Sequence, residues 1–153
     1  MEVFSGNGVA AVGTNKTIIN LFNSSATPTR RGQITYVSVG SNSSPANQQT
    51  DLVVNRSTGI GTEGSGFTPI NIDASGPAVA EYDIGVAHTV EPTYTAGAEL
   101  LPLLHFQLAF IQWVAQSEKH RLLLPATQNV GAGLYAKSSS GTPNLRGAFM
   151  FIE

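Results

Sequence analysis

Alternation of apolar and polar residues over short segments is the dominant pattern of this chain. The clearest case is the stretch 104–110, where Leu or Phe at each even position alternates with His105, Gln107 and Ala109. A period of two places the two sets on opposite faces of a strand. We therefore expect a half-buried strand over Leu104–Ala115, with His105 on its more polar face and a bend or turn midway. A helix is the alternative for this segment, but its aromatic and β-branched content favours the strand.

Segments of the same kind recur along the chain, separated by clusters of Gly, Pro, Ser and Asn. The expected strands are Val9–Val12, Thr17–Phe22, Gln33–Val39, Asp51–Asn55, Phe67–Ile72, Val79–Val86, Thr93–Thr95, Arg121–Pro125, Gly131–Ser138 and Leu145–Ile152. Turn signals about every ten residues are typical of a sandwich or barrel. We predict an all-β fold, a jelly-roll-like antiparallel β-sandwich of two sheets with little or no helix. The whole chain, 1–153, forms one domain, and residues 1–8 are expected to be frayed or to form an N-terminal arm.

Low charge narrows the classes of function. Charged residues make up 12% of the chain, about half the usual share, and the net charge is −2. Without a basic stripe, a nucleic-acid partner has little electrostatic support. The longest apolar run is interrupted by Pro102, His105, Gln107 and Gln112, so we expect no membrane span. The first twelve residues lack the basic region of a secretory signal, so none is expected.

Candidate reactive groups form no recognised catalytic or metal-binding pattern. The loop Gly59–Gly64 spells the dinucleotide fingerprint, but a strand rather than a helix is expected after it, so no helix N-terminus would hold a pyrophosphate. The chain has no Cys, and His88, His105 and His120 lack zinc-site spacing. No nucleophile elbow and no locally paired acids are present. We therefore expect no enzyme activity, no cofactor and no bound metal.

The composition is typical of β-rich proteins that work in assembled particles. Many small neutral side chains and 16 Gly suit surfaces that dock without desolvating charges. Trp113, in the most apolar segment, is expected in the core; an exposed aromatic platform would instead indicate sugar binding. The expected assembly contacts come from the arm and from the loops Gly40–Gln49 and Ser57–Gly66, and they are Val3, Phe4, Asn42, Gln48, Ile60 and Glu63.

The order of short motifs from about Ile18 onward resembles one family. Those motifs are Leu21-Phe22-Asn23, Arg30-Arg31, Ile34–Val39, Arg56-Ser57-Thr58, Gly59–Gly61 with Thr62, Thr68-Pro69, Glu91-Pro92-Thr93, His105–Val114, Leu124-Pro125-Ala126-Thr127, Gly131-Ala132-Gly133-Leu134 and Phe151-Ile152-Glu153. The sequence is similar to small jelly-roll-type β-sandwich proteins encoded among the structural genes of tailed bacteriophages, which serve as capsid decoration, cement or minor structural proteins.

This resemblance implies a particular role. The protein would be made in the host cytoplasm and bind the outer capsid surface of the virion, stabilising contacts of the major capsid protein. It would associate with itself, as a homotrimer, and would carry no catalytic residues. Two alternatives stay open: a carbohydrate-binding module on the virion, and a tail or head–tail connector component.

Overall fold

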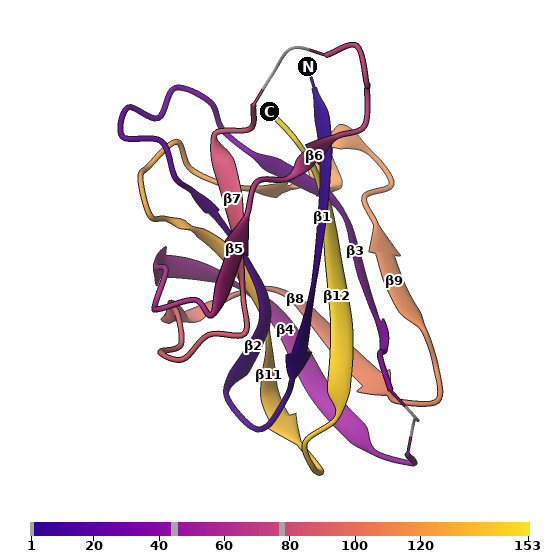
Figure 1. The fold of residues 1–153 in the computed structure, drawn as a ribbon. Helices are drawn as coiled ribbons and strands as arrows, with labels where there is room; N and C mark the ends of the chain where they lie inside the picture. Colours follow the sequence, from indigo (N-terminus) through magenta and orange to yellow (C-terminus); the bar gives the residue numbers. More distant parts are fainter. Residues whose placement is uncertain (1, 44–45, 77–78) are drawn as a thin grey trace.

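Two antiparallel sheets packed against each other form the fold (Figure 1). The structure is a computed structural model that describes residues 2–43, 46–76 and 79–153. Its strands are β1 (Val3–Ala11), β2 (Lys16–Asn23), β3 (Gln33–Ser41), β4 (Gln49–Gly59), β5 (Ser65–Phe67), β6 (Ile70–Asn71), β7 (Tyr82–Val86), β8 (Thr93–Phe106), β9 (Ile111–Val114), β10 (Leu122–Leu123), β11 (Gly131–Ser139) and β12 (Asn144–Ile152). The predicted all-β sandwich is confirmed; over the described ranges, helix is confined to the short 3-10 turn η1 (Glu118–His120).

Strand order in the two sheets mixes distant parts of the chain. One sheet has the order β10-β3-β12-β1-β6, with β9 also paired to β3, and the other has β5-β7-β2-β11-β4-β8. The first and last strands are neighbours, since β1 pairs with β12 from Val3↔Ile152 to Ala11↔Asn144. Both chain ends therefore lie at the same end of the sandwich (Figure 1). No helix in the described part of the chain has the length and apolarity needed to cross a membrane.

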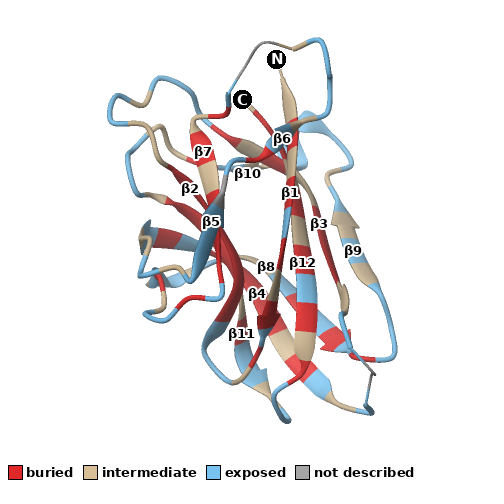
Figure 2. Ribbon diagram, viewed as in Figure 1, coloured by how far each residue is buried: buried red, intermediate tan, exposed pale blue. Residues whose placement is uncertain are grey.

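The core lies between the two sheets, where apolar side chains of both inner faces meet. Figure 2 marks the buried residues along the strands. Alternation along each strand sends one set of residues inward and the other outward, as in β12, where Leu145, Phe149 and Phe151 are buried and Arg146 is exposed. The largest fully buried side chains are Tyr82, Phe4, Phe149, Phe151, Ile18, Ile19, Leu21, Ile34, Leu52, Ile84, Leu124 and Leu134.

The prediction that residues 1–8 are frayed or form an arm is wrong for residues 2–8, the part of this segment that the structure describes. Val3–Ala11 is a regular strand, paired on one side with β12 and on the other with β6. Phe4 is completely buried and stacks on Phe151. The segment was expected to be free because it carries few apolar residues, but one large aromatic side chain and a full ladder of backbone hydrogen bonds hold it in the sheet. Phe4 is therefore a core residue and not an assembly contact, and Val3 is half-buried in the same strand.

Other expected strands also have different bounds. The strand predicted over Phe67–Ile72 is divided around Pro69 into β5 and β6, which belong to different sheets. Proline breaks a ladder because it has no N–H to donate. The short strand predicted over Thr93–Thr95 is the beginning of β8, which continues for fourteen residues to Phe106.

Candidate functional site

An exposed apolar turn joins β8 to β9 at one corner of the sandwich. The predicted bend in this segment is confirmed: β8 ends at Phe106, the Ala109 N–H donates to the Phe106 carbonyl at 2.9 Å, and β9 begins at Ile111. Four side chains of this turn are largely exposed, namely Leu104 (52%), Phe106 (46%), Leu108 (67%) and Phe110 (63%). We call these four residues the apolar tip.

The apolar tip reverses the usual distribution of residues. The period of two is as predicted, but the buried face is the polar one, with His105 1% and Gln107 5% exposed. Gln107 is held inside by the backbone of the loop before β4: its Oε1 accepts from the Ala46 N–H at 2.7 Å and its N–H donates to the Gln48 carbonyl at 3.1 Å. Burial lowers the pKa of His105, so its ring is neutral at neutral pH.

Both outer faces of the sandwich carry part of the apolar tip. Leu104 and Phe106 lie on β8 opposite Asp51 and Gln49 of β4, on the outer face of one sheet. Phe110 lies over Gly40 of the other sheet, where its Cδ2 is 3.4 Å from the position that a Cβ would take. Large apolar side chains that water surrounds on several sides mark an interaction surface.

The outer edge of β8 beside the apolar tip lacks one backbone donor for strand pairing. Because Gln107 donates to Gln48, alternation points the N–H groups of Leu103 and Leu101 toward β4 and leaves Pro102 at the free edge. Proline there has no N–H to offer an incoming strand, which is a common device against edge-to-edge association. A continuous backbone ladder with a partner strand would therefore be interrupted at Pro102.

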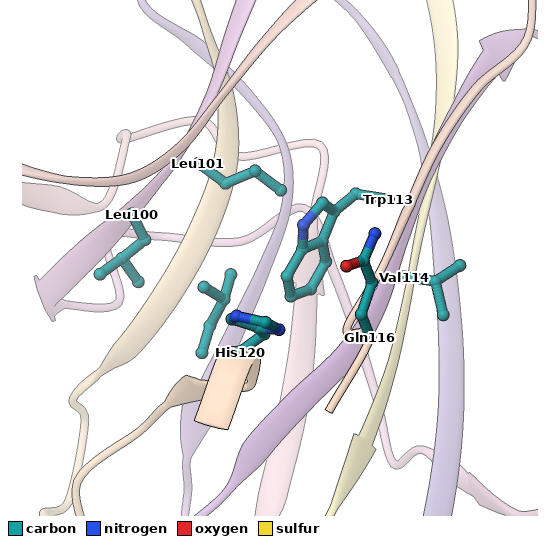
Figure 3. A pocket seen from close by; sticks show the side chains of 7 residues that line it. Leu100, Leu101, Trp113, Val114, Gln116 and His120 are labelled. Carbon is teal, nitrogen blue, oxygen red and sulfur yellow. The ribbon is translucent and has the colours of Figure 1, made fainter. Parts of the chain in front are cut away.

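An open cavity of about 380 Å³ lies between β8 and β9, several residues along the strands from the turn that joins them (Figure 3). Its walls are Leu100 and Leu101 from β8, Trp113 and Val114 from β9, and Gln116, His120 and Leu122 from the segment that follows. The indole of Trp113 faces Leu101 across the opening, with His120 below it (Figure 3). The prediction that Trp113 is a core residue is half right: it packs against the core and also lines this cavity, which we call the Trp113 cavity.

Charge is absent from the segment that forms the apolar tip and most of the cavity walls. Residues 100–117 contain no Asp, Glu, Lys or Arg. The nearest flanking acids have basic partners: Glu99 pairs with Lys137 at 2.8 Å and Glu118 with Arg121 at 3.4 Å. The cavity and the apolar tip therefore suit an apolar, uncharged ligand or partner.

A second cluster surrounds Glu63, one of the predicted contacts. Its carboxylate lies over Gly66 and Gly85, a cross-strand pair of β5 and β7, in the space that two Cβ atoms would fill. Burial, and then the charge of Asp83, raise the pKa of Glu63. His88 Nε2 lies 2.9 Å from the Cβ position of Gly85, and burial lowers the pKa of His88. Over the described residues, no three His, Asp or Glu side chains converge closely enough to hold a metal ion.

The predicted assembly contacts lie in three separate places. Asn42 and Gln48 flank the loop at the same end as the apolar tip, where Asn42 N–H donates to the Asn144 carbonyl at 2.9 Å. Ile60 and Glu63 lie far from them, in the loop that leads into β5; as expected, a strand and not a helix follows this fingerprint-like loop. Sequence reasoning missed the apolar tip, although the uncharged run around it was a usable signal.

Comparison with protein-family models, with curated protein sequences and with solved structures finds no match to this chain.

Proposed function

We propose that this protein is a non-enzymatic structural protein that works in an assembled form. The observation that carries the proposal is the apolar tip, in which four large side chains are exposed while the polar residues between them are buried. Leaving these four side chains in water forgoes the stabilisation that their burial would give, about 25 cal/mol per Å². Contact with another protein surface recovers that free energy and explains why the apolar residues face outward.

The assembly that we propose is the head of a tailed bacteriophage, with the protein as a capsid decoration or cement protein. The order of motifs that resembles such proteins supports this, and so does a surface of low charge and small polar residues. Many identical copies bound to neighbouring major capsid subunits would strengthen a shell even if each contact is weak. The loops around Asn42 and Gln48 and around Ile60 and Glu63 are the parts that we propose to contact the capsid.

Binding to particles tests this function directly. Purified protein is mixed with empty heads assembled from the major capsid protein of the phage that encodes it, and the heads are sedimented and imaged by electron microscopy. We expect the protein to sediment only in the presence of heads and to give repeated density on their outer surface. Density confined to the tail or the connector would instead support the alternative of a tail or head–tail component, and protein that never sediments with particles would refute both.

One observation favours a second candidate, a carbohydrate-binding module. Trp113 lines an open cavity together with the amide of Gln116 and the imidazole of His120, and aromatic rings beside polar groups are common in sugar sites. The remaining walls are aliphatic, which suits a sugar less well. A glycan array probed with the wild-type protein decides: binding that is lost in Gln116→Ala would support this function, and a blank array would discard it.

A further inference from the structure

We propose that the Trp113 cavity receives the apolar tip of a second copy of this chain, so that two copies pair through their β8–β9 edges around a twofold axis. This inference rests on the proposed function only in that the protein works in an assembled form. It names the partner of the apolar tip, and it leaves the loop around Ile60 and Glu63, at the other end of the sandwich, free to contact the capsid.

Charge supports a second copy as the occupant. Every residue from 100 to 117 lacks a formal charge, and the acids at its borders, Glu99 and Glu118, already have cationic partners. The cavity walls offer only the amide of Gln116 and the imidazole of His120 as polar partners, so an occupant with an acidic or basic group would lose hydration for little gain. The same uncharged edge on a second copy avoids that cost.

The size of the Trp113 cavity fits the side chains of the apolar tip. Its volume is about 380 Å³, whereas a protein cavity of about 150 Å³ already accepts a benzene molecule. There is room for the ring of Phe110 together with the side chain of Leu108. Both are more than three-fifths exposed, so they can enter a partner without being withdrawn from their own core.

The position of the two features along one edge favours a twofold arrangement. About five residues of extended strand separate Leu101 in the cavity wall from Phe106 at the apolar tip, a distance of roughly 17 Å. A twofold axis midway between them places each apolar tip against the other copy's cavity, so that one geometry makes two identical contacts. Pro102 prevents a continuous ladder between the two β8 strands, and the pairing therefore depends on side chains.

The apolar tip and the Trp113 cavity together supply the apolar area for a pair. Aromatic side chains bury roughly 150–250 Å² when covered completely, so half-exposed side chains of this size offer on the order of 100 Å² each. Leu108, Phe110 and Val114, which lie toward the sheet of β9, are more than half exposed; they give roughly 300 Å² of apolar surface per copy, and the apolar walls of the Trp113 cavity add to it. A homodimer interface of ordinary size needs about 65% apolar area out of some 800 Å² per partner.

Trp113 is the only Trp in the chain, so its fluorescence reports on its own cavity. The experiment measures mass by light scattering and the emission maximum of Trp113 over a dilution series of the full-length protein. We expect a dimer at high concentration, a monomer on dilution, and a red shift of the emission that follows dissociation. The double variant Leu108→Ser/Phe110→Ser, which changes only exposed side chains, should weaken dimerisation by at least about 30-fold.

The matched control is Ile70→Ser, which removes an equally exposed apolar side chain (74%) from β6, away from this edge. It should dimerise like the wild type. A second test, Gln116→Arg, puts a charge at the cavity mouth without touching the apolar tip and should also weaken the dimer. Circular dichroism of each variant establishes that the sandwich is folded.

Several outcomes would overturn this pairing. They are a wild-type monomer at all concentrations, a dimer or trimer unaffected by Leu108→Ser/Phe110→Ser, and a Trp113 emission that shifts with a glycan and not with protein concentration. Failure of the proposed function gives a different result, since protein that dimerises as described but never sediments with heads refutes the capsid role alone. Protein that binds heads as a monomer refutes the pairing alone.

Discussion

The ring of Phe4 stacks on the ring of Phe151, with centroids 5.5 Å apart and planes 22° from parallel. This contact joins β1 to β12 inside the core, where both side chains are fully buried. Phe4→Ala should lower the free energy of unfolding by about 3–5 kcal/mol, because it leaves a cavity between the sheets. Urea denaturation followed by circular dichroism measures this, with Val9→Ala on the other face of β1 as a control expected to cost less than about 1 kcal/mol. Equal midpoints for Phe4→Ala and the wild type would show that β1 adds little to the fold.

Tyr82 links three segments through its hydroxyl group. The hydroxyl accepts from the Gly32 N–H at 3.0 Å and donates to the Pro125 carbonyl at 2.9 Å. Tyr82→Phe should destabilise the protein by about 1–3 kcal/mol, because the buried backbone groups lose their partner. Tyr36→Phe is the matched control: its hydroxyl is exposed and makes only a 3.5 Å contact with Gln112, so its loss should cost less than about 0.5 kcal/mol. Thermal melts of the two variants side by side should separate them clearly.

Gly133 leaves space for the ring of Tyr94. A Cβ at Gly133 would lie 2.8 Å from Tyr94 Cε1, and Tyr94 in turn bonds Thr17 at 2.8 Å and stacks on Tyr135 with centroids 4.4 Å apart. Gly133→Ala should therefore cost about 1–3 kcal/mol and change the near-ultraviolet dichroism of the tyrosines. In the control, Gly59→Ala, the nearest atom is 3.5 Å away, and we expect neither effect. A Gly133→Ala spectrum identical to that of the wild type would contradict the packing described.

Glu63 should make stability depend on pH in a direction opposite to that of most acids. Burial and Asp83 raise its pKa above the ordinary 4.5, so the folded state binds the proton more tightly than the unfolded state. The contribution of Glu63 to the free energy of unfolding is fully present below about pH 4.5, and it is lost as the pH rises through the raised pKa of the folded state. Glu63→Gln, which cannot ionise, should gain a few tenths of a kcal/mol relative to the wild type between about pH 4 and pH 7, a small effect because the carboxylate is partly solvated. Urea midpoints at the two pH values test this, and a constant difference between the proteins would contradict it.

Most strands could be predicted because their residues alternate with a period of two. The predictions over Thr17–Phe22, Gln33–Val39, Gly131–Ser138 and Leu145–Ile152 each agree with an observed strand to within one or two residues. Predictions failed where local pattern was weak: β1 has too few apolar residues to be recognised along its whole length, and Pro69 divides a segment that looks continuous. In both cases, pairing with strands that are distant in the sequence decides where the observed strand begins and ends.

The candidate site was harder to predict than the strands. Alternation shows that Leu104 and His105 face opposite ways, but it does not say which of the two faces inward. The contacts of Gln107 with Ala46 and Gln48 decide this, because the Ala46 N–H donates to the side chain of Gln107, a hydrogen bond that a Leu side chain cannot accept. Those partners are some sixty residues away, so no local pattern contains them.

For this protein, the local order of residues alone determined the all-β class, the approximate strands, the absence of charge from 100 to 117 and the bend within it. Those properties follow from side-chain direction and turn chemistry, which act over a few residues. Only the tertiary structure decided the strand order, the burial of Phe4 and the outward face of the apolar tip. These depend on contacts between distant segments, whose free energy is gained only when the two sheets come together.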